Sequence, residues 1–178
     1  ILAAQTFAHD LFLRAGSYFA APNGTIKFEA INAESNESIA PFTVARFNDA
    51  SLFFSLSKTT RFKVEDLIKG EKSSFINLPT DSAGTYIFGL STTARELSLA
   101  AKDFNKMLKD EKIPDALAER EKLGELEKDG KGMYSRHAKA IFQVGDKLTD
   151  DYKKIFGYAA EIVPQKNPYK LKAGKMLE

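Results

Sequence analysis

The chain has 178 residues, which suits one domain of ordinary size, and 43% of them are hydrophobic, enough to bury a core. Its 26 basic and 24 acidic residues alternate along the chain and give a net charge of +2, so we expect no nucleic-acid partner. The absence of cysteine excludes disulfides, thiolate nucleophiles and cysteine-based metal sites. No apolar run approaches the length of a membrane span, so we expect no stable membrane insertion.

The first eight residues are apolar and rich in small side chains. Thr6-Phe7-Ala8 has small residues at the −3 and −1 positions of a signal-peptidase site. We interpret residues 1–8 as the remainder of a signal peptide, which predicts a periplasmic or secreted protein. A short disordered or strand-forming leader is the alternative interpretation.

Short strands dominate the sequence up to residue 100. Over residues 25–30, the apolar residues Ile26, Phe28 and Ala30 alternate with polar ones, the pattern of a half-buried strand. Similar patterns predict strands over residues 42–45, 52–56, 61–64, 84–90 and 96–99. Many short strands with no helices between them indicate an antiparallel sandwich or barrel rather than a parallel sheet.

The pattern changes to helical spacing from residue 101 to about residue 127. Phe104, Met107 and Leu108 form one apolar stripe, and Pro114 suits the first position of a second helix. Residues 128–132 are the expected exit loop. Strands are predicted again over residues 134–144, where a helix is the competing interpretation, and over 160–164. The expected fold is mainly β, a single antiparallel β-sandwich domain over residues 9–178 with a helical hairpin inserted at about 101–127.

The best candidate for chemistry is the pair that follows the predicted cleavage site. If Ala8 is the last residue removed, the α-amine and imidazole of His9 chelate a metal such as Cu(II) or Ni(II). Asp10 adds an oxygen ligand, and His137 completes the site if the fold brings its strand near the N-terminus. Alternatively, His9 opens the first strand, Asp10 forms a turn, and His137 is an exposed strand residue.

We expect no enzyme and no catalytic residues, because no pattern in the chain assembles a nucleophile, a base and an orienting group. The HExxH, P-loop, GxGxxG and GxSxG patterns are all missing from the sequence. A pocket that joined His137, Asp146 and a serine within hydrogen-bond distance would change this expectation.

Several segments together carry a family resemblance. The start, Ala8-His9-Asp10-Leu11-Phe12-Leu13, is similar to an AHDxWL motif. Residues 102–111, 117–120, 134–139, 143–146 and 161–169 are similar, in order, to further segments of the same family. That family consists of bacterial periplasmic proteins linked to nickel uptake (NikM-like), formerly a domain-of-unknown-function family. Phe12, Met107 and His137 depart from its pattern, so the resemblance implies no ligand role for His137.

The resemblance implies an immunoglobulin- or transthyretin-like sandwich and a second β-domain, of which this chain would hold only the N-terminal module. It also implies a periplasmic accessory protein in a Gram-negative envelope that binds a divalent ion (nickel, cobalt or copper) and passes it to a metal-uptake transporter. The alternative is a non-catalytic envelope module that binds another envelope protein. Its contact surfaces would be the helical hairpin and the strand with Phe53 and Phe54.

Overall fold

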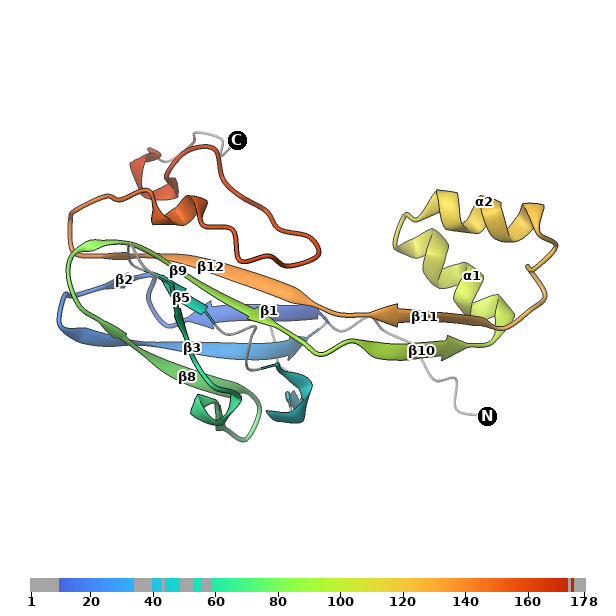
Figure 1. The fold of residues 1–178 in the computed structure, drawn as a ribbon, viewed down its shortest axis with the longest axis horizontal. Coiled ribbons are helices and arrows are strands. Elements are labelled where there is room, and N and C mark those ends of the chain that lie inside the picture. The colour runs from blue at the N-terminus through green and yellow to red at the C-terminus, as the bar shows by residue number, and fades with distance from the viewer. Residues whose placement is uncertain are drawn as a thin grey trace. The chain divides into compact units, whose positions relative to one another are not determined.

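The computed structural model describes residues 10–33, 40–42, 44–48, 53–55, 59–172 and 174, and Figure 1 shows their arrangement. These residues fall into two compact units. The smaller unit spans Ala94–Ser135, and the larger unit holds the described residues up to Thr93 and from Arg136 onward. Residues 1–8 and His9 lie outside the described residues.

The larger unit consists of two sheets. The strands of the first are β1 (Asp10–Ala15), β3 (Gly24–Ala33), β4 (Ala40–Pro41), β7 (Ile68–Lys69) and β8 (Ser74–Thr80). Those of the second are β2 (Phe19–Ala20), β5 (Phe53–Ser55), β6 (Thr59–Arg61), β9 (Gly84–Ser91) and β12 (His137–Val144). The strand orders are β1-β3-β8-β7, with β4 also beside β3, and β2-β12-β9-β5-β6. These pairs are antiparallel except that β2 is parallel to β12.

The core lies between the two sheets. The alternation predicted for β3 holds, because Ile26, Phe28 and Ala30 are all buried. The ring centroid of Phe28 lies 5.5 Å from that of Phe88 in β9 and 5.2 Å from that of Phe142 in β12. Aromatic rings from both sheets therefore meet in one core, and the predicted antiparallel β-sandwich is confirmed.

The predicted strands over residues 84–90 and 96–99 are also confirmed, and the one over 52–56 is confirmed for residues 53–55. Leu52 and Leu56 lie outside the described residues. The predicted strand over 134–144 is in fact parts of two strands, because residues 135–136 do not belong to a strand. Its competing interpretation as a helix is wrong.

The predicted strand over residues 42–45 is wrong. The strand there ends at Pro41, and Val44–Arg46 forms a turn of 3-10 helix. Phe42 and Phe47 are both buried with their ring centroids 5.4 Å apart. The turn therefore brings two aromatic rings together in the core, which an extended strand would not do.

The predicted strand over residues 61–64 is wrong in its second half. β6 ends at Arg61, and Val64–Asp66 forms another 3-10 turn. The Asp66 carboxylate accepts a hydrogen bond from the backbone N–H of Lys63 at 2.7 Å. This side-chain cap favours a turn over continued extension.

The smaller unit contains the predicted helical pair. Strands β10 (Arg95–Leu99) and β11 (Gly130–Tyr134) pair antiparallel, and between them lie α1 (Ala101–Asp110) and α2 (Pro114–Lys122). Pro114 begins α2 as predicted, whereas residues 130–132 belong to β11 rather than to an exit loop. Neither helix is long and apolar enough to cross a membrane, and the same holds throughout the described part of the chain.

Two residues hold the helical pair together. The ring of Phe104 in α1 packs so closely on Gly130 that a Cβ atom there would overlap it. Arg120 of α2 donates hydrogen bonds to the Asn105 side chain at 2.9 Å and to the carbonyls of Glu125 and Lys128 at 2.7 and 2.6 Å. The Arg120 guanidinium thus joins α1, α2 and the chain that leads into β11.

We predict that Phe28→Ala lowers the free energy of unfolding by about 3–5 kcal/mol, because it leaves a cavity between the two sheets. Phe12→Ala is the matched control, since Phe12 is 43% exposed, and it should cost less than about 1 kcal/mol. Urea titrations followed by circular dichroism measure both. Equal losses in the two variants would contradict the placement of the core.

Candidate functional site

Two neighbouring strands bring predicted metal-binding residues toward the same end of the larger unit. Asp10 is the first residue of β1 and His137 the first of β12. These strands lie beside each other and run in the same direction (Figure 1). His9, directly before β1, and the side chain of Asp10 lie outside the described residues. Within the described residues no group of three His, Asp or Glu side chains is placed to hold a metal ion, so ligation by His9, Asp10 and His137 stays a prediction.

His137 is half-buried rather than exposed. Its Nδ1 atom lies 2.7 Å from the Ser91 hydroxyl of β9, the residue opposite it in the sheet. Its ring stacks on Tyr158, with centroids 5.1 Å apart and an angle of 15° between the planes. Because Ser91 contacts Nδ1, a metal on this ring would be ligated through Nε2, with the ring orientation fixed by its neighbours.

The pair of Ser91 and His137 does not extend to Asp146. His137 begins β12, whereas Asp146 follows the C-terminal end of this 8-residue strand. Eight extended residues span about 26 Å. The Asp146 carboxylate therefore cannot orient the His137 ring, and the Ser91 hydrogen bond is a cross-strand polar pair.

A buried ion pair lies on the same face of β12 as His137. Lys139 Nζ is 2.8 Å from the Glu161 carboxylate, and the two side chains are only 10% and 6% exposed. Lys139 also donates to the Lys154 carbonyl at 3.0 Å. The pair attaches the C-terminal strap, which we define as residues 154–171, to the outer face of the second sheet.

Glu161 also orders the strap itself. Its carboxylate accepts hydrogen bonds from the backbone N–H groups of Phe156, Gly157 and Tyr158, at 3.0, 2.6 and 2.8 Å. Burial raises the pKa of Glu161, but the hydrogen bonds from Lys139 and the backbone outweigh it and lower the pKa to about 2. These bonds curl the chain around the carboxylate, which explains why the predicted strand over residues 160–164 is wrong.

Three further contacts hold the strap on the sheet. At Gly89 of β9 a Cβ atom would lie 2.5 Å from the Phe156 ring and 2.7 Å from the Tyr158 hydroxyl oxygen, so glycine permits the close approach. The buried Asn167 amide donates to the Thr85 hydroxyl at 2.8 Å. The Tyr169 hydroxyl donates to the Ile141 carbonyl at 2.9 Å.

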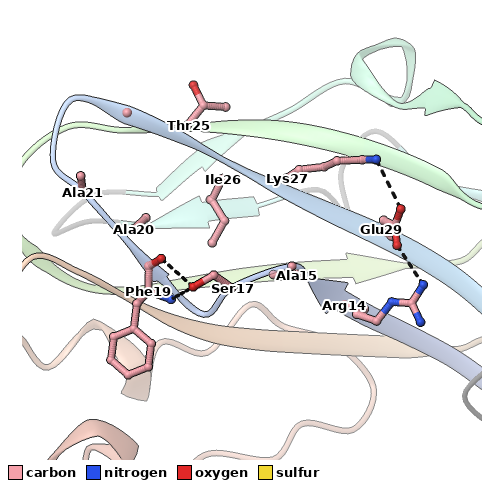
Figure 2. Close-up of a pocket in the computed structure, with 12 residues that line it drawn as sticks. Arg14, Ala15, Ser17, Phe19, Ala20, Ala21, Thr25, Ile26, Lys27 and Glu29 are labelled. Carbon is pink, nitrogen blue, oxygen red and sulfur yellow. Dashed lines mark hydrogen bonds and ion pairs between the residues drawn. The ribbon is translucent and has the colours of Figure 1, made fainter.

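A separate pocket of about 510 Å³ opens at the edge of the sandwich (Figure 2). It lies where the chain leaves β1, crosses to the second sheet at β2 and returns along β3. Ala15, Ala20 and Ile26 give it an apolar lining, with Ser17 and Thr25 beside them. A volume of this size suits a small ligand or part of a peptide.

Three charged side chains stand at one side of this pocket. The Glu29 carboxylate lies 3.0 Å from the Arg14 guanidinium and 3.3 Å from Lys27 Nζ. The Arg14 hydrogen bond is the main reason that the pKa of Glu29 is lowered. The Arg14 and Lys27 side chains are 52% and 50% exposed, so two cationic groups are accessible at this pocket wall.

Comparison with known protein families matches residues 6–178 to a family described as a domain of unknown function, DUF4198. The chain belongs to the DUF4198 family. No curated protein and no solved structure matches it.

Sequence reasoning missed most of the side chains that surround His137 in this DUF4198 chain. Ser91 and Tyr158 are 46 and 21 positions away along the chain, and only the pairing of β9 with β12 and the docking of the strap bring them together. The sequence does show Lys139 as a basic residue on the face of its strand opposite to Ala140 and Phe142, which are buried. It does not show the partner that Lys139 binds.

We predict that Glu161→Gln lowers the free energy of unfolding by about 3 kcal/mol near neutral pH, because it leaves the Lys139 charge buried without its partner. The folded pKa of Glu161 is about 2 against an ordinary 4.5. A lowered pKa stabilises the fold above pH 4.5, and this contribution is lost as the pH falls toward 2. The difference between the wild type and the variant should therefore shrink below pH 4.5.

Urea titrations between pH 7 and pH 3 measure that difference. Asp150→Asn is the matched control, because the ion pair of Asp150 with Lys153 is largely exposed, and it should change stability by less than about 1 kcal/mol. A pH-independent effect of Glu161→Gln would contradict the assignment.

Proposed function

We propose that this DUF4198 chain is a divalent-metal-binding accessory protein of the bacterial periplasm, which captures nickel, or cobalt or copper, and passes it to an uptake transporter. The observation that carries the proposal is the position of Asp10 and His137 at the starts of β1 and β12, two strands of different sheets that contact each other and run in the same direction. His9 directly precedes the first of these strands.

The chemistry of the site follows from cleavage after Ala8. The α-amine and imidazole of His9 then form a chelate ring, for which Ni(II) and Cu(II) have high affinity. Asp10 supplies a carboxylate oxygen and His137 supplies Nε2. The contacts of His137 with Ser91 and Tyr158 support this role, since partners of this kind orient the rings of metal-binding histidines. The resemblance to a nickel-uptake family supports the choice of metal.

Isothermal titration of Ni(II) into protein that begins at His9 tests the proposal. We predict one ion per chain, with binding abolished by His9→Ala and by an uncleaved N-terminus. His137→Ala should weaken binding by about tenfold or more. Asp146→Ala is the control for loss of an acidic side chain, because it lies at the other end of β12, and it should bind as the wild type does.

The proposal also predicts that affinity rises with pH, since the α-amine must lose its proton to bind. No binding by the protein that begins at His9 would contradict the proposal. Undiminished binding by His9→Ala would contradict the N-terminal site.

The alternative that we carry is a non-catalytic envelope module for protein interaction. Exposed apolar side chains on the smaller unit support it, with Met133 68% and Leu123 58% exposed. The side chains of Phe53 and Phe54, the other surface expected for this role, lie outside the described residues. No binding of Ni(II) in the titration would favour this alternative.

A further inference from the structure

The first sheet has an open edge at the pocket. β1 pairs with β3 only over residues 28–33 of β3, from Ala15 opposite Phe28 to Asp10 opposite Ala33. After Ala15 the chain turns away to β2, which pairs with β12 of the other sheet. On this side, no strand pairs with residues 24–27 of β3 in the described part of the chain. We call these four residues the open edge.

The backbone of the open edge faces the pocket. Thr25 lies opposite Pro79 of β8. Opposed residues in an antiparallel pair either exchange two backbone hydrogen bonds or point their N–H and C=O groups away from each other. Because proline has no N–H, the pair is of the second kind, so the backbone groups of Thr25 point away from β8. Those of Lys27, two residues along, point the same way.

The side chains around the open edge differ on its two faces. Toward the core, Ile26 lies beside the small Ala15 and Ala20 (Figure 2). On the outer face, Lys27 and Arg14 share the Glu29 carboxylate. A segment that pairs with the open edge would therefore place one side chain against an apolar, small-residue surface and the next beside two cations.

We propose that the open edge binds an extended acidic segment of a partner protein, which adds to the sheet beside β3 as a short strand. Two observations point to this occupant. Backbone N–H and C=O groups directed at a pocket suit a peptide backbone, and the exposed cationic side chains of Arg14 and Lys27 suit acidic side chains on the outer face. The site is distinct from the start of β1 and does not depend on metal binding.

The same geometry defines the sequence that fits. Alternate residues of the segment must be small and apolar, to lie against Ile26, Ala15 and Ala20. The residues between them must be acidic, to lie beside Lys27 and Arg14. Four residues of strand span about 13 Å, so a short segment is enough to cover the open edge.

The probe is a fluorescein-labelled, acetylated hexapeptide in which glutamate alternates with alanine, titrated with the full chain and followed by fluorescence anisotropy. We expect saturable binding of this peptide. A peptide with lysine in place of glutamate tests the charge, and a peptide with N-methylated backbone amides tests the strand pairing. Both should bind at least about tenfold more weakly.

Two variants locate the binding. Lys27→Glu should weaken the acidic peptide about tenfold and improve the lysine peptide, because it reverses the charge beside the open edge. Thr25→Pro should weaken both by removing an N–H that does not point toward β8. Lys69→Glu, on exposed β7 of the same sheet, makes the same charge change elsewhere and should bind as the wild type does. Thermal melts check that each variant is folded.

Absence of peptide binding would overturn the proposal, as would equal binding of the acidic and lysine peptides. Binding that survives Lys27→Glu would place the peptide elsewhere and overturn it too, whether or not Thr25→Pro folds. Free glutamate is added as a competitor. Displacement by glutamate at the concentration that the peptide itself requires would mean a small-carboxylate pocket and overturn the peptide assignment.

Discussion

The pairing of β9 with β12 is the interaction on which the rest of the larger unit depends. Its register runs from Ser91 opposite His137 to Gly84 opposite Val144. Because side chains alternate along a strand, this single register sends Phe142 into the core and keeps His137 and Lys139 on the opposite face. A slip of one residue would exchange the two faces and expose the core.

The outer face of that pair is covered by the strap rather than by another sheet. A buried ion pair is a weak source of net stability, but loss of one partner is costly. Lys139 and Glu161 therefore act mainly to specify where the strap docks, helped by the N–H groups that Glu161 accepts. The hydrogen bonds of Asn167 and Tyr169 fix its C-terminal half in the same way. We expect amide exchange in the strap to be slower than in an ordinary surface loop.

The sequence predicts the local features of this fold well. The alternation of apolar and polar residues predicts the buried face of β3. Helical spacing of apolar residues, together with Pro114, predicts the helical pair. β8 was not predicted, although its buried residues Ile76 and Leu78 alternate with more exposed ones and Pro79 lies near its end. The structure tolerates Pro79 because its missing N–H points away from β3. Residues 42–45 and 160–164 were predicted as strands because alternation shows neither the ring contact of Phe42 with Phe47 nor the backbone N–H groups that hydrogen-bond to Glu161.

The candidate site was predictable only in part. The His9-Asp10 pair is visible in the sequence because its two members are neighbours and follow a cleavage motif. The surroundings of His137 are not, since Ser91 and Tyr158 reach it through strand pairing and strap docking. The pocket beside β3 was likewise hidden, because it exists only where β1 leaves the sheet and Arg14, Lys27 and Glu29 meet.

The central claim is that the starts of β1 and β12 serve one metal site. The most direct test is to record imidazole ¹H–¹⁵N NMR spectra of the protein that begins at His9 while the diamagnetic ion Zn(II) is added. Our account predicts that the Nε2 signal of His137 and the ring signals of His9 shift together and saturate at one ion per chain. Shifts of His9 alone, with His137 unchanged at saturation, would contradict a shared site.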